Sequence, residues 1–396
     1  MQKKIIALAV AGLMSGAAFA QSNVVISGNL DAGANFTKVE GSSRATNAAY
    51  NNTSTSIIAF KATEDLGGGM KAGAYIETNP LGANVAATGV MGDFQRYVFI
   101  NGGFGELSLG QRTNFSTTTA TTAQPFGTAL GGGYSGAAGR LRGAGYSATG
   151  ALTTSLVGTR DVRAEGSVRY DSPNFNGFTF GATWKPQNNA GDTGGATSGH
   201  TNLGLNYAGG PLKVSYAYAK IKSDVGAGAA GATTYACGAG TTLVLTGGVP
   251  VCIDDAHVAA PVAATATAGA AGAAAYEQNI KHNMLAANYT IGAATIYGGY
   301  TTSKGNINAA ATDVNSASWN LAVKYAVAGN IDLMANYLKD NDKTAVDANR
   351  KLFGLGADYK FSKRTAAYFR YENYDPSDKA ANDKLKTYSV GLRHSF

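Results

Sequence analysis

The chain has 396 residues with a formal net charge of +7, and only 14% of its residues are charged, against about 25% in an ordinary soluble domain. Its mean hydropathy of −0.09 excludes a bundle of membrane-spanning helices, each of which needs about 20 consecutive apolar residues. Collagen-like and disordered chains are excluded too, because the 53 glycines have no fixed period and 21 tyrosines and 15 phenylalanines are present.

The first 20 residues predict a cleaved secretory signal. Two lysines precede an apolar stretch from Ile5 to Met14, and small residues follow up to Ala20. This order of a basic, an apolar and a small-residue region is typical of export signals. The apolar run of about 10 residues is too short to cross a bilayer core. We therefore expect residues 1–20 to be removed and residues 21–396 to fold as one domain.

The rest of the chain predicts strands with two unlike faces. From Phe178 to Trp184 apolar residues alternate with small or polar ones, and the alternation returns in later segments. Each run lasts about 9 to 11 residues, which is the length that a tilted strand needs to cross a hydrocarbon core. Among the apolar positions of the later runs are Leu203, Leu205, Tyr207, Val214, Tyr216, Tyr218, Trp319, Leu321, Val323, Tyr325, Leu333, Tyr337, Phe353, Leu355 and Tyr359.

The polar face of these runs favours a transmembrane barrel over a soluble β-sandwich. It holds Gly, Ala, Thr, Asn and Lys, as in Asn320, Ala322 and Lys324, which a water-filled interior tolerates. The apolar face often ends in an aromatic residue such as Tyr325, as in the interface girdles of membrane barrels. A sandwich also alternates, but its outer faces should carry more charge. Only a closed barrel lets strands cross lipid with every backbone group paired, so we predict an all-β transmembrane antiparallel barrel.

Connections between the strands alternate between short and long. Short turns at one end and long loops at the other are typical of outer-membrane barrels, whose turns face the periplasm. Eight long loops imply about 16 strands, and a barrel of that size encloses an aqueous channel. The long connections are residues 37–52, 80–92, 113–164, 186–199, 221–278, 304–316, 341–350 and 374–385.

Several segments along the chain match a known family. The most specific are Glu64-Asp65-Leu66-Gly67-Gly68-Gly69 and the ending Val390-Gly391-Leu392-Arg393-His394-Ser395-Phe396. These segments resemble the general Gram-negative porins of the neisserial and β-proteobacterial type, and the resemblance covers all of residues 21–396. It implies a homotrimer of 16-stranded barrels in the outer membrane, in which the third long loop, residues 113–164, folds inward to narrow each pore. Such porins pass small hydrophilic solutes and ions by passive diffusion, without a cofactor and without enzymatic activity.

The resemblance also implies partners. Phe396, preceded by alternating apolar residues, resembles the signal that the barrel assembly machinery of the outer membrane recognises. A lipid-facing girdle position would explain the same residue, and both roles can hold. The barrel is expected to lie in outer-membrane lipid and lipopolysaccharide. Its modest positive charge is spread along the chain and gives no reason to expect nucleic acid.

Strand parity predicts which charged side chains face the pore. We assign apolar strand residues such as Phe60, Tyr97 and Val168 to the lipid face. The residues of opposite parity then face the pore, and the basic ones among them are Lys61, Arg96, Arg112, Arg169, Lys185, Lys213, Lys324, Lys360, Arg370 and Arg393. Bases outnumber acids there, which favours anions. A solvated strand end would explain any one of them, so only their clustering predicts an anion-preferring constriction. The candidate pore-lining residues are Lys61, Arg96, Arg112, Arg140, Arg142, Arg160, Arg163 and Arg169, with Asp31, Asp161 and Glu165 as acids.

The two cysteines, Cys237 and Cys252, both lie in the long external loop of residues 221–278. In an oxidising compartment a pair this close in sequence is expected to form a disulfide worth about 3 kcal/mol of loop constraint, although two free thiols remain the alternative. The four histidines show no close pair, and no cysteine or acid completes a ligand set, so no metal site is expected.

Two other functions stay open on the sequence alone. A hydrolase of the outer membrane would need an activated nucleophile, or a histidine with acids, on the external rim. His200 and His257 lie in or beside predicted loops, but no acidic constellation can be assigned to either. An adhesin or receptor would act mainly through the outsized loops, and it would bind a ligand specifically without conducting ions.

Overall fold

The computed structural model describes residues 23–39, 47–51, 55–80, 94–132, 163–188, 197–225, 234–236, 241–246, 249–254, 262–263, 265–267, 276–306, 313–343, 349–375 and 384–396. Strands dominate these ranges, and the one helix among them is α3 (Phe115–Thr122). That helix is too short to cross a membrane. The predicted signal of residues 1–20 lies outside the described residues.

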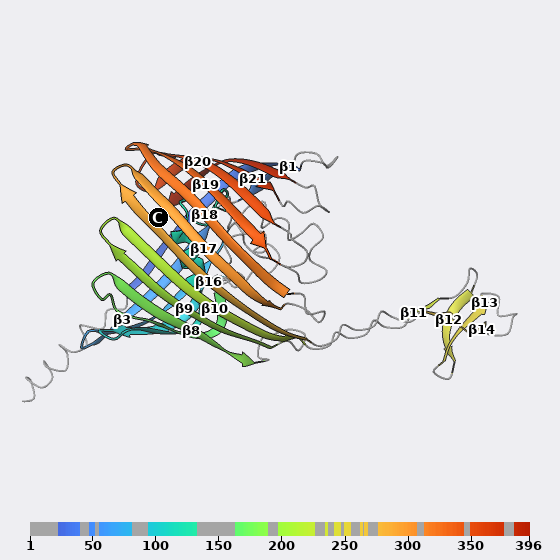
Figure 1. Cartoon of the computed structure of the whole chain (residues 1–396). Coiled ribbons are helices and arrows are strands. Elements are labelled where there is room, and N and C mark those ends of the chain that lie inside the picture. Colours follow the sequence, from blue (N-terminus) through green and yellow to red (C-terminus); the bar gives the residue numbers. More distant parts are fainter. Residues whose placement is uncertain are drawn as a thin grey trace, which may run out of the picture.

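Sixteen strands close into one antiparallel barrel, which confirms the predicted fold class (Figure 1). Each strand pairs with the next along the chain, and β22 pairs with β1 to close the ring. The short β2 (Asn47–Asn51) lies beside the second half of β1, in line with β3, which pairs with the first half. The barrel strands are β1 (Asn23–Val39), β3 (Ile57–Gly67), β4 (Met70–Thr78), β5 (Arg96–Gly102), β6 (Gly105–Thr113), β7 (Arg163–Asp171), β8 (Phe178–Asn188), β9 (Thr197–Gly209), β10 (Leu212–Val225), β16 (Tyr276–Ile291), β17 (Ala294–Asn306), β18 (Asp313–Ala328), β19 (Ile331–Asp342), β20 (Arg350–Lys360), β21 (Thr365–Asp375) and β22 (Leu385–Ser395).

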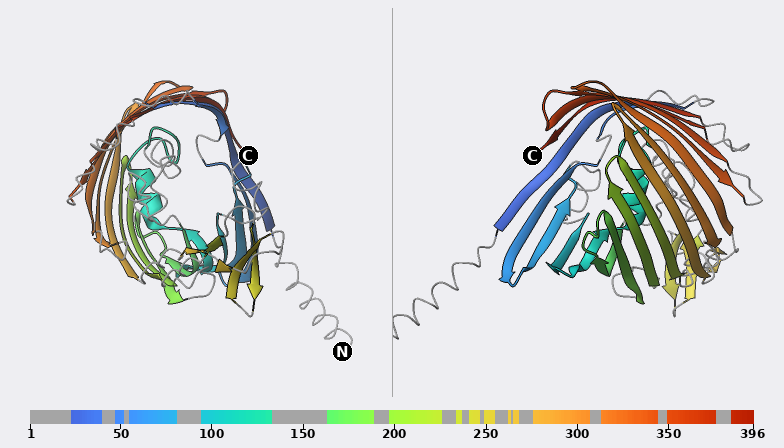
Figure 2. Two further views of the ribbon diagram at one scale, coloured as in Figure 1. Left: turned by 90° about the vertical axis from the view of Figure 1, so that its right-hand side faces the viewer. Right: turned by 60° about the vertical axis from the view of Figure 1, so that its left-hand side comes forward.

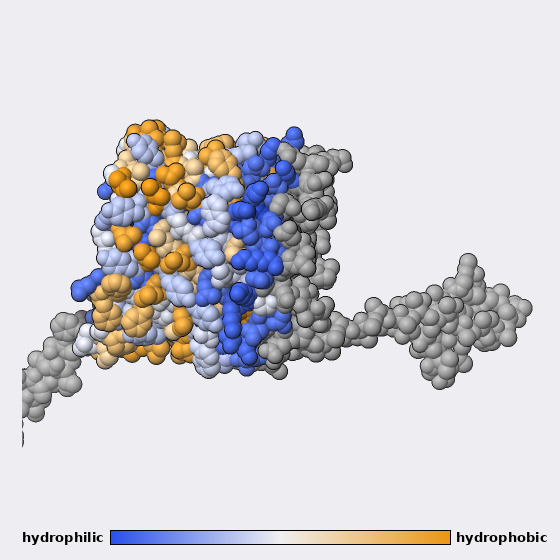
Figure 3. All heavy atoms as spheres, in the orientation of Figure 1, coloured by the Kyte–Doolittle hydropathy of each residue, from blue (hydrophilic) through white to orange (hydrophobic). Residues whose placement is uncertain are grey.

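The two faces of each strand differ as the alternation predicts. In β18, Trp319, Leu321 and Val323 are 40%, 59% and 38% exposed, whereas Asn320 and Ala322 between them are buried. The exposed apolar side chains face outward, where lipid replaces water as the solvent. Figure 3 shows this apolar surface over the part of the strands away from the loops, and a hydrophilic belt toward the loop end.

Short turns and long connections lie at opposite ends of the barrel. Seven connections have only a few residues between paired strands, and the long ones all lie at the other end. The chain end closes the seam at the turn side, because Phe396 exchanges two backbone hydrogen bonds with Gly28, at 3.0 and 3.1 Å. The seven short connections are residues 67–70, 102–105, 171–178, 209–212, 291–294, 328–331 and 360–365.

Strands also occur inside the connection predicted as one long loop at 221–278. β12 (Thr241–Thr246) pairs with β13 (Val249–Asp254), which pairs with β14 (Val262–Ala263), and β11 (Thr234–Ala236) pairs with β15 (Thr265–Thr267). The β-branched residues of β12 and β13 flank a Gly-Gly pair, which favours a hairpin. Cys252 lies in β13, but its side chain and Cys237 lie outside what is described, so the disulfide stays a prediction.

The third long connection turns into the barrel. Figure 2 shows α3 and the turns after it inside the ring of strands, as its left view looks along the barrel. α3 packs against β9, β10 and β16. The inward fold predicted for residues 113–164 therefore holds for the described part, up to residue 132.

The outward apolar band generates a depth-dependent prediction. Val323 and Val327 both face outward on β18, four residues apart, with Val327 next to the turn. Val323→Arg is expected to destabilise the folded barrel by about 2–4 kcal/mol, because it lies near the middle of the band, and Val327→Arg by about 0–1 kcal/mol. Urea titration of both variants in lipid vesicles, followed by tryptophan fluorescence, measures the difference. Equal losses would show that this face does not lie in lipid.

Candidate functional site: the constriction loop and the charged wall

The constriction loop (residues 114–132 in the described part) begins at a buried asparagine on β9. The Phe115 backbone N–H donates to Asn202 Oδ1 at 2.7 Å, and Asn202 Nδ2 donates to Ser116 Oγ at 2.8 Å. Asn202 is fully buried. Because its amide both accepts from and donates to the first turn of α3, it fixes where the loop leaves the wall.

Further inward side chains hold the loop at successive strands. Glu372 on β21 accepts the Gly131 backbone N–H at 2.8 Å, and its side chain is fully buried. A neutral amide suits the other positions because it satisfies a buried carbonyl without adding charge. The amide donors are Asn288 Nδ2 to the Thr122 carbonyl oxygen (3.0 Å), Asn320 Nδ2 to Ala123 (2.7 Å) and Asn336 Nδ2 to Gly131 (3.1 Å).

Inward glycines make room for the loop against the wall. A Cβ at Gly204 would lie 2.4 Å from the Phe115 ring, and one at Gly354 would lie 2.1 Å from the Gly131 carbonyl oxygen. Neither position could carry a larger side chain without moving the loop. The other inward glycines in contact with the loop are Gly181 at Phe115, Gly299 at Ala123 and Gly356 at Phe126.

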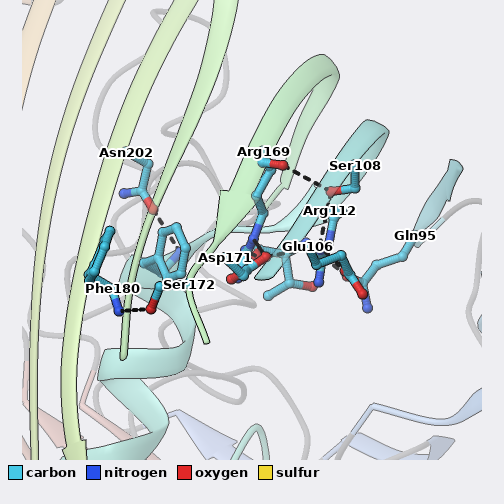
Figure 4. A network of polar contacts seen from close by, with 11 residues as sticks. Gln95, Glu106, Ser108, Arg112, Arg169, Asp171, Ser172, Phe180 and Asn202 are labelled. Carbon is cyan, nitrogen blue, oxygen red and sulfur yellow. Dashed lines mark hydrogen bonds and ion pairs between the residues drawn. The ribbon is translucent and has the colours of Figure 1, made fainter. Parts of the chain in front are cut away.

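Two predicted arginines meet two carboxylates at the start of the loop (Figure 4). Arg169 donates from Nε and Nη2 to the two oxygens of Asp171, at 2.8 and 2.6 Å. Arg112 Nη1 donates to Glu106 Oε1 at 2.7 Å and to Asp171 Oδ2 at 3.0 Å. The cluster holds two positive and two negative charges, so its net charge is close to zero.

Arg169 also connects this cluster to the constriction loop. Its Nη1 donates to the Thr113 carbonyl oxygen at 2.6 Å, and its guanidinium lies 3.8 Å above the Phe115 ring. The side chain is 11% exposed. A bidentate ion pair, a backbone hydrogen bond and a cation–π contact together hold one guanidinium, so Arg169 positions the loop.

The structure places Arg96 on the outward face. Its cross-strand partner Ile76 and its neighbour Val98 are 42% and 55% exposed. Tyr97 points inward instead, and its ring stacks on the Tyr75 ring at 5.1 Å between ring centroids. The parity that assigned Tyr97 to lipid is therefore shifted by one residue on β5. Arg96 forms an ion pair with Glu165, and both side chains are exposed.

Of the other described candidates, Lys61 and Asp31 lie on the inner face. Lys61 shares its face with the buried Ala59, is exposed, and lies 5.1 Å above the Phe99 ring. Asp31 is buried and accepts the Tyr368 hydroxyl at 2.8 Å. Arg163 was predicted to line the pore, but its neighbour Ala164 is buried opposite the inward Arg112, so Arg163 lies on the outward face at the loop end of β7, 4.0 Å above the Phe94 ring. The loop candidates Arg140, Arg142, Arg160 and Asp161 lie outside the described residues.

A second charged cluster lies on the last strands. Strand parity placed its basic residues on the inner face but did not identify the acids that pair with them. Arg370 forms an ion pair with Asp358 at 2.6 Å, and Arg393 approaches the same carboxylate at 3.6 Å. Lys360 pairs with Asp332 at 2.7 Å. Sequence reasoning missed these partners and the asparagine tethers, although asparagine at inward positions was visible in the alternation. Across the described chain, no three His, Cys, Asp or Glu side chains gather as a metal site.

The tethers generate a prediction about the width of the pore. Asn320→Ala with Asn336→Ala removes two hydrogen bonds to the constriction loop, worth about 2 kcal/mol together. The freed loop should raise the single-channel conductance and the current noise. Asn283→Ala is the control, because Asn283 accepts the Tyr216 hydroxyl on the outward face. Unchanged conductance and noise in the double variant would mean that these amides do not hold the loop.

Comparison with known proteins places the chain in a family. The family model for Gram-negative porins matches residues 7–251 and 253–379. Outer membrane porin protein 32 of Delftia acidovorans is 32% identical over 231 residues, which cover 57% of this chain and 62% of that protein. An outer membrane porin protein of Bordetella pertussis is 25% identical over 426 residues, with both chains fully covered.

Solved structures share the barrel. The anion-selective porin from Comamonas acidovorans has a TM-score of 0.68 and 22% identity, over 95% of this chain and all of that one. The trimer form of OmpT from Vibrio cholerae has a TM-score of 0.61 and 16% identity, over 95% of this chain and 99% of that one. At identities this low, the similarity to solved structures shows only the fold. Membership in a family is shown by the match to the family model. With well over half of its length matched, the chain belongs to the Gram-negative porin family.

Proposed function

We propose that this protein is an outer-membrane channel for passive diffusion of small hydrophilic solutes and ions, with a preference for anions. The observation that carries the proposal is the constriction loop tethered inside a 16-stranded barrel, because a barrel of that size encloses an aqueous channel. Family membership supports the same function. No finding favours an adhesin.

The relatives are channels rather than enzymes, and we expect no enzymatic activity here. A hydrolase would need an activated nucleophile, or a histidine with acids, on the external rim; His200 lies in β9 and is 4% exposed, and His257 lies outside the described residues. Neither a cofactor nor a metal is needed for diffusion through a wet pore.

The preference for anions comes mainly from lysines. Lys61, Lys213 and Lys324 face inward, and among the described residues none of the three has a carboxylate within ion-pair distance. Arg112, Arg169 and Arg370, in contrast, are neutralised by acids. Unpaired lysines on the wall attract anions. The similarity to a structure described as an anion-selective porin supports this assignment.

The assembly partners follow from the family. A homotrimer is proposed, and the relative from Vibrio cholerae solved in a trimer form supports it. Phe396 is 40% exposed at the turn end, so its ring is accessible both to the barrel assembly machinery and to lipid. Lipid and lipopolysaccharide are proposed to surround the barrel.

Lys61→Glu tests the selectivity. A unit charge about 8 Å from an ion in water contributes about 0.5 kcal/mol, and screening reduces this, so charge reversal should lower the anion-over-cation permeability ratio by about threefold. Reversal potentials in a potassium chloride gradient across a planar bilayer give the ratio. Lys339→Glu on the outward face is the matched control and should change nothing. A cation preference in the unmodified protein would remove the anion assignment but leave the channel.

A further inference from the structure

Three lysines form a row across adjacent strands on the outside of the barrel. Lys220 on β10 is the register partner of Lys281 on β16, and Lys281 is the register partner of Lys304 on β17. Neighbouring strands lie about 4.8 Å apart, so three positive side chains start within about 10 Å of one another.

All three lysines point away from the pore. On β10, Ser215 points inward and donates to Thr122 of the constriction loop, so Lys220 lies on the opposite face. On β16 and β17 the inward positions His282 and Ser303 are buried and hydrogen-bonded to each other at 2.7 Å. Lys281 and Lys304, each next to one of these residues, are exposed.

The row lies at the loop side of the apolar band. Four residues closer to the turns, the outward positions of the same strands are Tyr216, Leu285 and Tyr300, and Trp319 continues that row on β18. Aromatic residues at this level are typical of the interface between hydrocarbon and head groups. The lysines lie about 13 Å further along the strands, toward the loop end.

No acid in the described part of the chain neutralises the row. The row is flanked by Thr201 on β9 and by Asn315 on β18, and no ion pair joins any of the three lysines. The nearest acids of the same parity come further toward the loops: Asp313 on β18 is two residues beyond Asn315, about 7 Å along the strand, and the register partners Asp224 and Glu277 are four residues beyond the lysines, about 13 Å. Like charges directly opposite in an antiparallel pair are destabilising, so the row needs negative charge from outside the chain.

A second lysine pair differs in this respect. Lys339 on β19 faces Lys351 on β20, but Lys351 is also the register partner of Asp375. Asp375 forms an ion pair with Lys384 at 3.3 Å. An acid of the chain is thus close to that pair, whereas the row of Lys220, Lys281 and Lys304 has none at its level.

We propose that Lys220, Lys281 and Lys304 form a binding site for the phosphate groups of lipopolysaccharide in the outer leaflet. The site faces lipid, lies at head-group height on the loop side, and carries three unpaired charges, which match a polyanionic glycolipid and not a passing solute. It rests on the outer-membrane location of the family but not on the selectivity of the pore, because the row lies on the opposite face of the wall.

Lys220→Gln with Lys281→Gln and Lys304→Gln removes the site. The control, Lys71→Gln with Lys363→Gln and Arg364→Gln, removes three positive charges at or near the turns of the opposite end. Each detergent-solubilised barrel is titrated with purified lipopolysaccharide, with the same lipopolysaccharide after enzymatic removal of its phosphates, with phosphatidylglycerol and with inorganic phosphate. Native mass spectrometry counts the bound lipid, and planar-bilayer conductance checks the pore.

Each lysine near an anionic surface contributes about fivefold in affinity, so the triple variant should bind lipopolysaccharide about 100-fold more weakly, with unchanged conductance. The control variant should bind like the unmodified protein, and the dephosphorylated lipid should bind the unmodified protein as weakly as intact lipid binds the triple variant. Unchanged binding by the triple variant, equal binding of the dephosphorylated lipid, or equal binding of phosphatidylglycerol or free phosphate overturns the site. If the unmodified protein conducted no ions, that result would instead contradict the proposed channel function.

Discussion

Lipid offers no hydrogen-bond partner to a strand edge, and this constraint determines the rest of the structure. The pairing of β22 with β1 from Asn29 to Val39 removes the last free edge, and the backbone of Phe396 completes the seam at Gly28. Once the ring is closed, each strand has one face toward lipid and one toward water. The two unlike faces of each strand explain the period-two alternation of the sequence.

The inner face of the ring then serves a second purpose. A wall that only had to be wet could carry any polar residues, but this one carries glycines and asparagines where the constriction loop touches it. Gly204 and Gly354 let the loop lie directly against the backbone. Asn202 and Asn320 satisfy its buried backbone groups without adding charge. The constriction therefore depends as much on the wall as on the loop.

Much of this could be predicted from the sequence, because each strand needs only local alternation to reveal its faces. Parity failed on β5, where Tyr97 is an aromatic residue inside the barrel, and a one-residue shift moved Arg96 to the outside. The pairing of Arg112 with Glu106 and Asp171 was not predictable, because it depends on cross-strand register and on the irregularity between Gly110 and Arg112.

Arginine and lysine side chains have different roles in this barrel. Arg169 binds both oxygens of Asp171 with the planar fork of its guanidinium, and Arg370 forms an ion pair with Asp358, so nearby carboxylates cancel most of the field of both arginines. Lysine is a strongly hydrated point charge on a flexible stem, and some lysines on each surface have no ion pair within the described residues. Lys61 inside and Lys281 outside thus present the same charge to different partners, a diffusing anion and a fixed lipid phosphate. The wall that separates them keeps the two roles independent.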